Sequence, residues 1–180
     1  MKNLLMACAA MFMTVGGWAA DGRAVDRPIE DFYGEFVGRS VAGGGVKARD
    51  INITIEAVRR GFNISWSTVS YGASGKAKRK SYSIDFRRTK RDNIYLSSMR
   101  KDVFGNRAPN DPMKGDPYVW SRIDGDTLSV YALIVTDDGS YDMQVYHRTL
   151  TANGMRLKFT RFLEGEAKKI ITGELKRVVK

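Results

Sequence analysis

His147 is the only histidine of this 180-residue chain and the side chain best suited to catalysis or metal binding. It alternates with Tyr141, Met143 and Val145, so a β-strand would turn it inward together with these apolar residues. An inward imidazole could ligate haem iron or another metal, act as a general base, or simply be a hydrogen-bonded member of an end layer. No second histidine is available for a zinc site, and the single cysteine, Cys8, lies near the start of the chain. The sequence therefore predicts a protein that is not an enzyme and has no cofactor.

Three aspartates, Asp137, Asp138 and Asp142, surround a glycine-bearing turn. Their spacing fits a hairpin turn better than a calcium-binding loop. We therefore expect no calcium site there.

Basic residues gather between the apolar runs of a chain whose formal net charge is +10. One group contains Lys76, Lys78 and Arg79, and another contains Arg100 and Lys101. Such groups would attract a fatty acid, a phosphorylated glycolipid or an anionic envelope membrane, although the same charge could serve solubility alone. A further basic group at 87–91 lies at the opposite end of the expected fold. Nucleic acid is not an expected partner, because exposed aromatic residues are not interleaved with the basic ones.

The elements that must position these residues are strands, because apolar and polar side chains alternate from Phe32 onward. We expect ten of them, near residues 33–39, 48–58, 62–70, 80–88, 93–98, 118–123, 126–136, 140–149, 155–163 and 167–178. Glycines mark the tight turns between them, at positions where a positive φ is expected: Gly61, Gly125, Gly139, Gly154 and Gly165. The pattern predicts an all-β fold, an antiparallel up-and-down β-barrel of about 8 to 10 strands. A single helical turn at 28–32, capped by Asp26, should precede the first strand.

The helical turn, the tripeptide Gly34-Glu35-Phe36 at the start of the first strand, and Arg177 in the last strand resemble the lipocalin-like (calycin) barrels. In that family a Gly-x-Trp opens the first strand, and a late Arg or Lys packs over the Trp and closes one end of the barrel. Phe36 stands here where the family has Trp. The resemblance implies a barrel that can hold a small apolar ligand, and it names no ligand.

The long connections near 40–47, 71–79 and 99–117 are all odd-numbered, so in a meander they lie at the same end and could form the mouth of a cavity. The side chains expected to line that cavity, or otherwise to pack as core, are Trp66, Tyr82, Trp120, Tyr141, His147 and Phe159. The outward face of the sixth and seventh strands should carry an apolar patch for a second copy, another protein or a membrane, made of Ile123, Tyr131, Leu133 and Val135.

Residues 1–19 resemble an export signal, with Lys2 ahead of an apolar run from Leu4 to Trp18. The remaining residues, 20–180, are expected to form one domain that is periplasmic or secreted. Leu5-Met6-Ala7-Cys8 also resembles a lipid-attachment box, so lipidation at Cys8 stays open.

Together these features predict an exported soluble barrel that binds a small apolar or amphiphilic anion, such as a fatty acid or lipid-like molecule. One alternative is a structural or interaction protein of the cell envelope with a packed barrel. Another is an outer-membrane barrel, whose apolar strand faces would meet lipid.

Overall fold

A computed structural model describes residues 25–41, 48–72, 75–97 and 110–179. The expected export signal, Cys8, Arg100 and Lys101 lie outside these residues. In chain order the elements are η1 (Ile29–Phe32), β1 (Gly34–Ser40), β2 (Asp50–Val58), β3 (Gly61–Tyr71), β4 (Ala77–Arg88), β5 (Ile94–Ser97), η2 (Pro112–Lys114), β6 (Tyr118–Asp124), β7 (Thr127–Val135), β8 (Tyr141–Thr151), β9 (Gly154–Leu163) and β10 (Glu166–Arg177).

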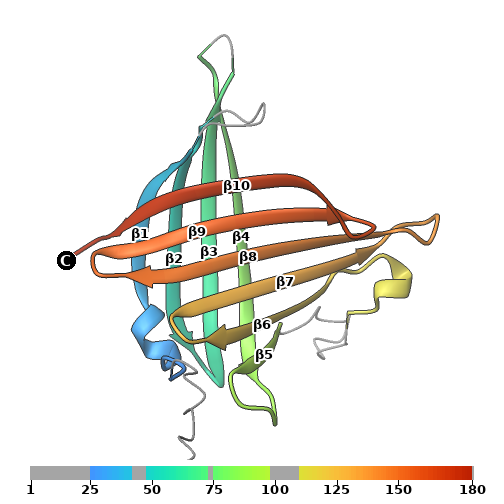
Figure 1. Cartoon of the computed structure of the whole chain (residues 1–180), viewed down its shortest axis with the longest axis horizontal. Coiled ribbons are helices and arrows are strands. Elements are labelled where there is room, and N and C mark those ends of the chain that lie inside the picture. Colours follow the sequence, from blue (N-terminus) through green and yellow to red (C-terminus); the bar gives the residue numbers. More distant parts are fainter. Residues whose placement is uncertain (1–24, 42–47, 73–74, 98–109, 180) are drawn as a thin grey trace, which may run out of the picture.

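All ten strands form one closed antiparallel barrel in which each strand pairs with its neighbours in sequence and β1 pairs with β10. In Figure 1, β1 to β4 run up the picture and β6 to β10 run across in front of them. The β3–β4 hairpin projects from the top, and η1 lies at the bottom. The expected all-β up-and-down barrel is confirmed.

Two of the five turn glycines occupy their positions for a reason other than a positive φ. Gly125, Gly139 and Gly165 have positive φ as expected, whereas at Gly61 the positive φ belongs to the preceding Arg60, at 71°. A Cβ on Gly61 would lie 1.9 Å from the carbonyl oxygen of Phe86 on the neighbouring strand. A Cβ on Gly154 would likewise lie 2.0 Å from the carbonyl oxygen of Leu175. These two glycines allow a close backbone approach.

The apolar core fills the half of the barrel next to η1. Its fully buried side chains come from the strand ends at that side and from η1 itself, and the largest are Phe32, Phe36, Phe62, Phe86, Ile55, Ile123, Leu128 and Met155. Phe62 stacks on Phe86 at 5.1 Å and meets the edge of Tyr95 at 4.9 Å. In most strands the apolar face lies inside the barrel, whereas in an outer-membrane barrel the apolar faces point outward.

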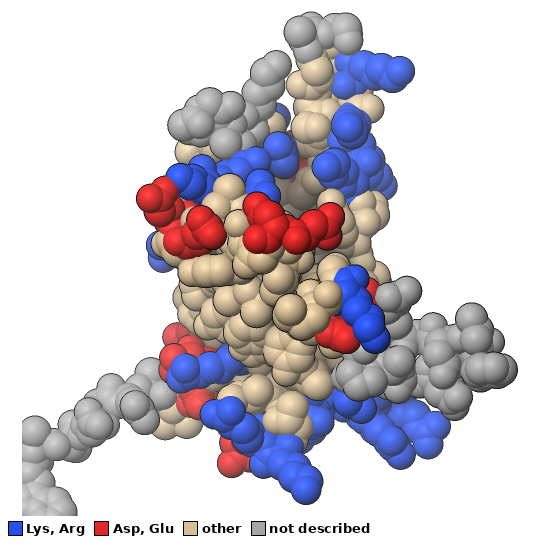
Figure 2. Space-filling model, turned by 90° about the vertical axis from the view of Figure 1, so that its right-hand side faces the viewer, with Lys and Arg blue, Asp and Glu red and all other residues tan. Residues whose placement is uncertain are grey.

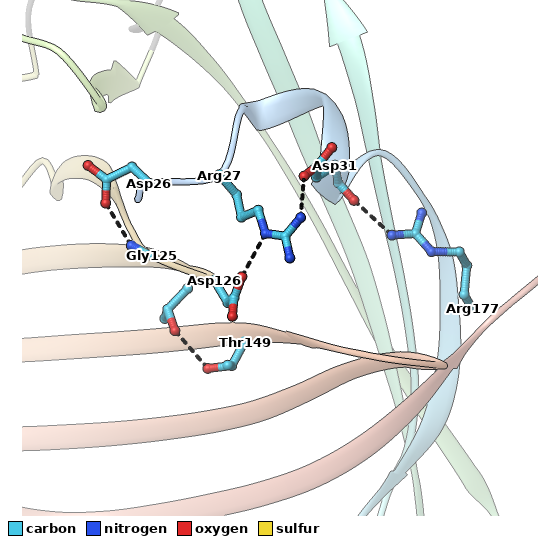
Figure 3. A network of polar contacts seen from close by, with 8 residues as sticks. Asp26, Arg27, Asp31, Gly125, Asp126, Thr149 and Arg177 are labelled. Atoms are coloured by element: carbon cyan, nitrogen blue, oxygen red, sulfur yellow. Dashed lines mark hydrogen bonds and ion pairs between the residues drawn. The ribbon is translucent and has the colours of Figure 1, made fainter. Parts of the chain in front are cut away.

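Arg177 closes this end of the barrel over Phe36, as the calycin resemblance implies. Its guanidinium lies 4.6 Å from the centre of the Phe36 ring and donates a hydrogen bond to the backbone oxygen of Tyr33. It also donates one to the backbone oxygen of Asp31 (Figure 3). Gly34 has a φ of 138°, and a Cβ there would lie 2.8 Å from the Nη1 atom of Arg177. The glycine of the tripeptide therefore makes room for the arginine.

The N-terminal segment is also tied to the β6–β7 turn, which corrects the predicted role of Asp26. The 3-10 turn η1 has Pro28 as its N-cap residue and no side-chain cap. Asp26 instead accepts a hydrogen bond from the backbone N–H of Gly125, at 2.7 Å (Figure 3). It accepts another from the side chain of Asn93. Arg27 bonds Asp126 in the same turn, at 2.8 Å.

Candidate functional site

A cavity of about 190 Å³ lies in the half of the barrel away from η1 and opens to solvent. Its wall is formed by inward side chains of β2, β3, β4, β8, β9 and β10 and by residues beside the β1–β2 connection. The lining residues are Ser40, Arg49, Ile51, Ile53, Trp66, Thr68, Lys80, Tyr82, Tyr146, Arg148, Leu157, Phe159, Lys169 and Ile171. The barrel is therefore packed at one end and hollow at the other.

Arg148 is the unusual residue of this cavity. Its side chain is 1% exposed, and its Nε and Nη1 atoms have no hydrogen-bond partner among the described residues. The guanidinium lies over the rings of Trp66, at 5.7 Å, and Tyr146, at 5.5 Å. Burial lowers the pKa of Arg148 to about 10, so the charged form is poorly compensated in the cavity.

The register of β8 explains why Arg148 points inward. It pairs with Leu128 of β7 and Leu157 of β9, and both leucines belong to the buried core. Side chains directly opposite each other on paired strands share one face of the sheet. Asp142, Gln144 and Tyr146 alternate with Arg148 and so face the lumen as well. The inner face of β8 is consequently polar.

A hydrogen-bonded chain holds the polar side chains of β8 in place. The Tyr146 hydroxyl donates to Gln144, at 3.2 Å, and the Gln144 amide donates to Asp142, at 3.4 Å. Arg161 of β9 donates to the same carboxylate, at 2.8 Å, and forms an ion pair with it. Arg161 thus neutralises Asp142, and no described acidic residue neutralises Arg148.

Three further cations surround the outer part of the cavity. Arg49, Lys80 and Lys169 line it, and the buried Nε atom of Arg49 has no hydrogen-bond partner in the described part of the chain. None of the described lining residues is acidic. In Figure 2, Lys and Arg side chains lie in the upper part of the molecule on both sides of a recess, with Asp and Glu side chains below them. The cavity is thus positively charged from its rim to Arg148.

Aromatic rings form much of the apolar wall, and three of the predicted lining residues are among them. Trp66 stacks on Tyr82 at 5.1 Å, and Tyr146 packs against Phe159 at 4.7 Å. Trp66 also contacts Tyr146 across the lumen, at 5.9 Å. The prediction placed Trp66, Tyr82 and Phe159 at the cavity correctly and missed Tyr146 and Arg148.

Trp120 lies on the outer face of the barrel, which corrects its predicted inward position. The inward residues of β6 are its buried neighbours, Val119 and Ser121. Trp120 stacks on Tyr131 of β7 at 5.0 Å.

The predicted outer apolar patch is correct except for Ile123, which is a buried core residue. Tyr131, Leu133 and Val135 do lie on the outward face of β7, opposite in alternation to the core residues Leu128 and Val130.

His147 and Tyr141 also lie on the outer face, because the inward positions of β8 are the even-numbered ones. A ring nitrogen of His147 is hydrogen-bonded to Ser129 at 2.8 Å, and its ring meets the edge of Tyr131 at 6.5 Å. Burial, with the nearby Lys158 adding to it, lowers the pKa of His147. Tyr141 is exposed beside the β9–β10 turn. Neither side chain lines the cavity of Arg148.

Among the residues predicted to form a basic mouth, Lys76, Lys78 and Arg79 are exposed on the β3–β4 hairpin.

In the described part of the chain, no group of three or more His, Cys, Asp or Glu side chains is arranged to hold a metal ion. Among the same residues, no helix is long and apolar enough to cross a membrane.

Searches of protein-family models, curated proteins and solved structures give no match to this chain. Its candidate site therefore has to be interpreted from its own geometry.

Proposed function

We propose that the barrel binds a small anion with an apolar body, and that the anionic group pairs with Arg148. The observation that carries this proposal is the buried guanidinium of Arg148, which lines a cavity and has no acidic partner among the described residues. A carboxylate can accept two parallel hydrogen bonds from a guanidinium, which would satisfy the unpartnered nitrogen atoms. The aromatic and aliphatic walls would hold the rest of the ligand.

The cavity volume narrows the expected ligand to a small one. Drug-sized ligands occupy pockets of roughly 300–1,000 Å³, whereas a cavity of about 150 Å³ holds benzene. The cavity here measures about 190 Å³. We therefore favour a short-chain acid or a single-ring aromatic acid over a long fatty acid, whose tail would extend past Lys80 into solvent.

We further propose that the protein is exported, is not an enzyme and is of the calycin type. The contact of Arg177 with Phe36 and the close packing of Gly34 support the calycin assignment. The signal-like composition of residues 1–19 supports export.

An interaction protein is the second candidate, and the outer aromatic row supports it. Tyr118, Trp120 and Tyr131 pack in sequence on the outer face of β6 and β7, at 5.7 and 5.0 Å. Tyrosine and tryptophan are enriched in the central contacts of protein interfaces. A second copy of the chain is one partner that this row could contact.

Titration calorimetry with octanoate and with 1-octanol tests the ligand proposal. The two probes share an alkyl chain and differ in charge, so pairing with Arg148 predicts heat of binding for octanoate and far weaker binding for 1-octanol. The variant Arg148→Met should weaken octanoate binding by about 30-fold or more, because it removes one partner of a buried charge pair. Arg156→Met is the matched control, since Arg156 is exposed on the outer face and paired with Glu174.

Fluorescence gives an independent measurement. Trp66 forms the cavity wall and Trp120 lies outside, so octanoate should change the emission of a Trp120→Phe variant and leave that of Trp66→Phe unchanged. Equal binding of octanoate and 1-octanol, or an unchanged affinity in Arg148→Met, would contradict the proposal. Absence of binding by any acid from butanoate to dodecanoate, or by benzoate, would favour the interaction protein.

A further inference from the structure

We propose that the β3–β4 hairpin docks the mouth of the barrel on the surface of an anionic lipid bilayer. The docking surface consists of the basic residues Lys76, Lys78 and Arg79 and the exposed apolar residues Val41 and Ile170 near the mouth. This inference does not require the proposed ligand, because none of these five side chains lines the cavity.

The charge of the hairpin is not compensated within the described protein. Lys76, Lys78 and Arg79 are exposed, and none of them forms an ion pair with another described residue. The nearest acidic residue along β2, Asp50, is already paired with Arg39, at 2.8 Å, and accepts a hydrogen bond from a tyrosine hydroxyl. Each basic residue near an anionic bilayer strengthens binding roughly fivefold.

Exposed apolar side chains accompany this charge. Val41 is 62% exposed and Ile170 is 54% exposed. The backbone N–H of Val41 bonds the carbonyl of Thr172 at 2.8 Å, which places Val41 beside the stretch of β10 that carries Ile170. Tyr82, on the hairpin itself, is 49% exposed. Basic charge beside exposed apolar and tyrosine side chains is the chemistry that suits the interface of a bilayer.

The acidic residues at neighbouring tips would orient the barrel on such a surface. Asp137 and Asp138 lie in the β7–β8 turn, and Glu164 lies in the β9–β10 turn. Figure 2 shows acidic side chains below the basic ones on this side of the molecule. An anionic bilayer would repel them, so the hairpin end would face the lipid and the recess beside it would lie close to the surface.

Co-sedimentation with lipid vesicles tests this proposal. The protein should bind vesicles of equal parts phosphatidylglycerol and phosphatidylcholine and should not bind vesicles of phosphatidylcholine alone. The triple variant Lys76→Gln, Lys78→Gln and Arg79→Gln should partition on the order of 100-fold less, since three basic contacts are removed. Ile170→Ser should lower partitioning by roughly 10-fold, because an apolar contact with lipid is lost.

The matched control is the triple variant Arg87→Gln, Lys90→Gln and Arg91→Gln. It changes the net charge by the same amount, and its residues are also exposed, at the other end of β4. Nine residues of strand separate Lys78 from Arg87, a distance of about 30 Å, which exceeds a Debye length of about 10 Å. The control should therefore bind vesicles nearly as well as the unmodified protein.

Equal losses in the two triple variants would overturn the docking proposal, since binding would then follow net charge alone. No preference for phosphatidylglycerol vesicles would also overturn it. Octanoate binding separates this proposal from the proposed function: the hairpin variant should keep it, and Arg148→Met should keep vesicle binding.

Discussion

Replacing Arg148 by methionine should make the ligand-free protein more stable while weakening its affinity for acids. Burial lowers the pKa of Arg148 to about 10, well below the pKa of a solvated guanidinium. One pKa unit corresponds to about 1.4 kcal/mol, so the folded state disfavours the charged guanidinium by about 3 kcal/mol. Methionine is unbranched and apolar, and it fills irregular spaces well. The variant should therefore relieve the cost of burying the charge.

Part of this gain is offset by lost contacts with Trp66 and Tyr146. The two ring contacts together contribute about 1 to 2 kcal/mol, at about 0.5 to 1 kcal/mol each. The net gain in the free energy of unfolding should then be about 1 to 2 kcal/mol, which raises Tm by roughly 2 to 8 °C in a protein of this size. Because the folded pKa lies below the unfolded one, the destabilisation is present at pH 7 and fades as the pH rises above about 10. The advantage of the variant should fade over the same range.

Thermal unfolding followed by circular dichroism, with and without octanoate, measures both effects. At an octanoate concentration of about 100 times the Kd of the unmodified protein, that protein should gain about 2.7 kcal/mol and the variant about 1 kcal/mol or less. Arg156→Met should change neither result by much, since exposed ion pairs contribute about 0 to 1 kcal/mol. A variant that is less stable than the unmodified protein, and is still stabilised by octanoate, would refute the reasoning.

Three further predictions concern the barrel itself. Gly61→Ala should lower the free energy of unfolding in urea by about 3 kcal/mol or more, because its Cβ would lie 1.9 Å from the Phe86 carbonyl oxygen. A urea midpoint equal to that of the unmodified protein would contradict this close approach. Arg177→Met should lower the same free energy by about 2 to 3 kcal/mol, since two backbone carbonyls of the N-terminal segment lose a charged donor. An unchanged value would show that the closure of the barrel end by Arg177 contributes little to stability. The imidazole of His147, followed by NMR, should titrate below its usual pKa of 6.5. Lys158→Met should move the midpoint of this titration upward, because a nearby positive charge is removed. A midpoint above 6.5 in the unmodified protein would count against the burial of the imidazole.

The fold was predictable because most strands carry their apolar side chains on the face that the core covers. Ile51, Ile53 and Ile55 alternate with polar residues in β2, and all three are buried inside the barrel. The same pattern correctly placed Trp66 and Phe159 at the cavity. Alternation is informative in these strands because one face meets the core and the other meets water.

β8 shows why the centre of the site could not be predicted in the same way. The odd-numbered residues Met143 and Val145 are apolar and lie on the outer face beside the aromatic row. The even-numbered residues Asp142, Gln144 and Arg148 are polar and face the lumen. The usual assignment of apolar residues to the interior therefore places His147 inside and Arg148 outside. The neighbouring strands could have revealed the reversal, since Arg148 pairs with Leu128 and Leu157.

The reversal in β8 is itself an argument for binding. A strand that only had to complete a packed barrel would gain stability by turning its apolar face inward, and an apolar residue in place of Arg148 would avoid the cost of burying a charge. Arg148 lies where the packed half of the barrel meets the cavity, with the core residue Leu128 opposite it and open space beyond. In a barrel with only a structural role, a buried cation that lacks an acidic partner among the described residues would lower the stability of the fold without any benefit. A barrel that recognises an acid needs one there, because the charge can discriminate between ligands only if water does not already satisfy it.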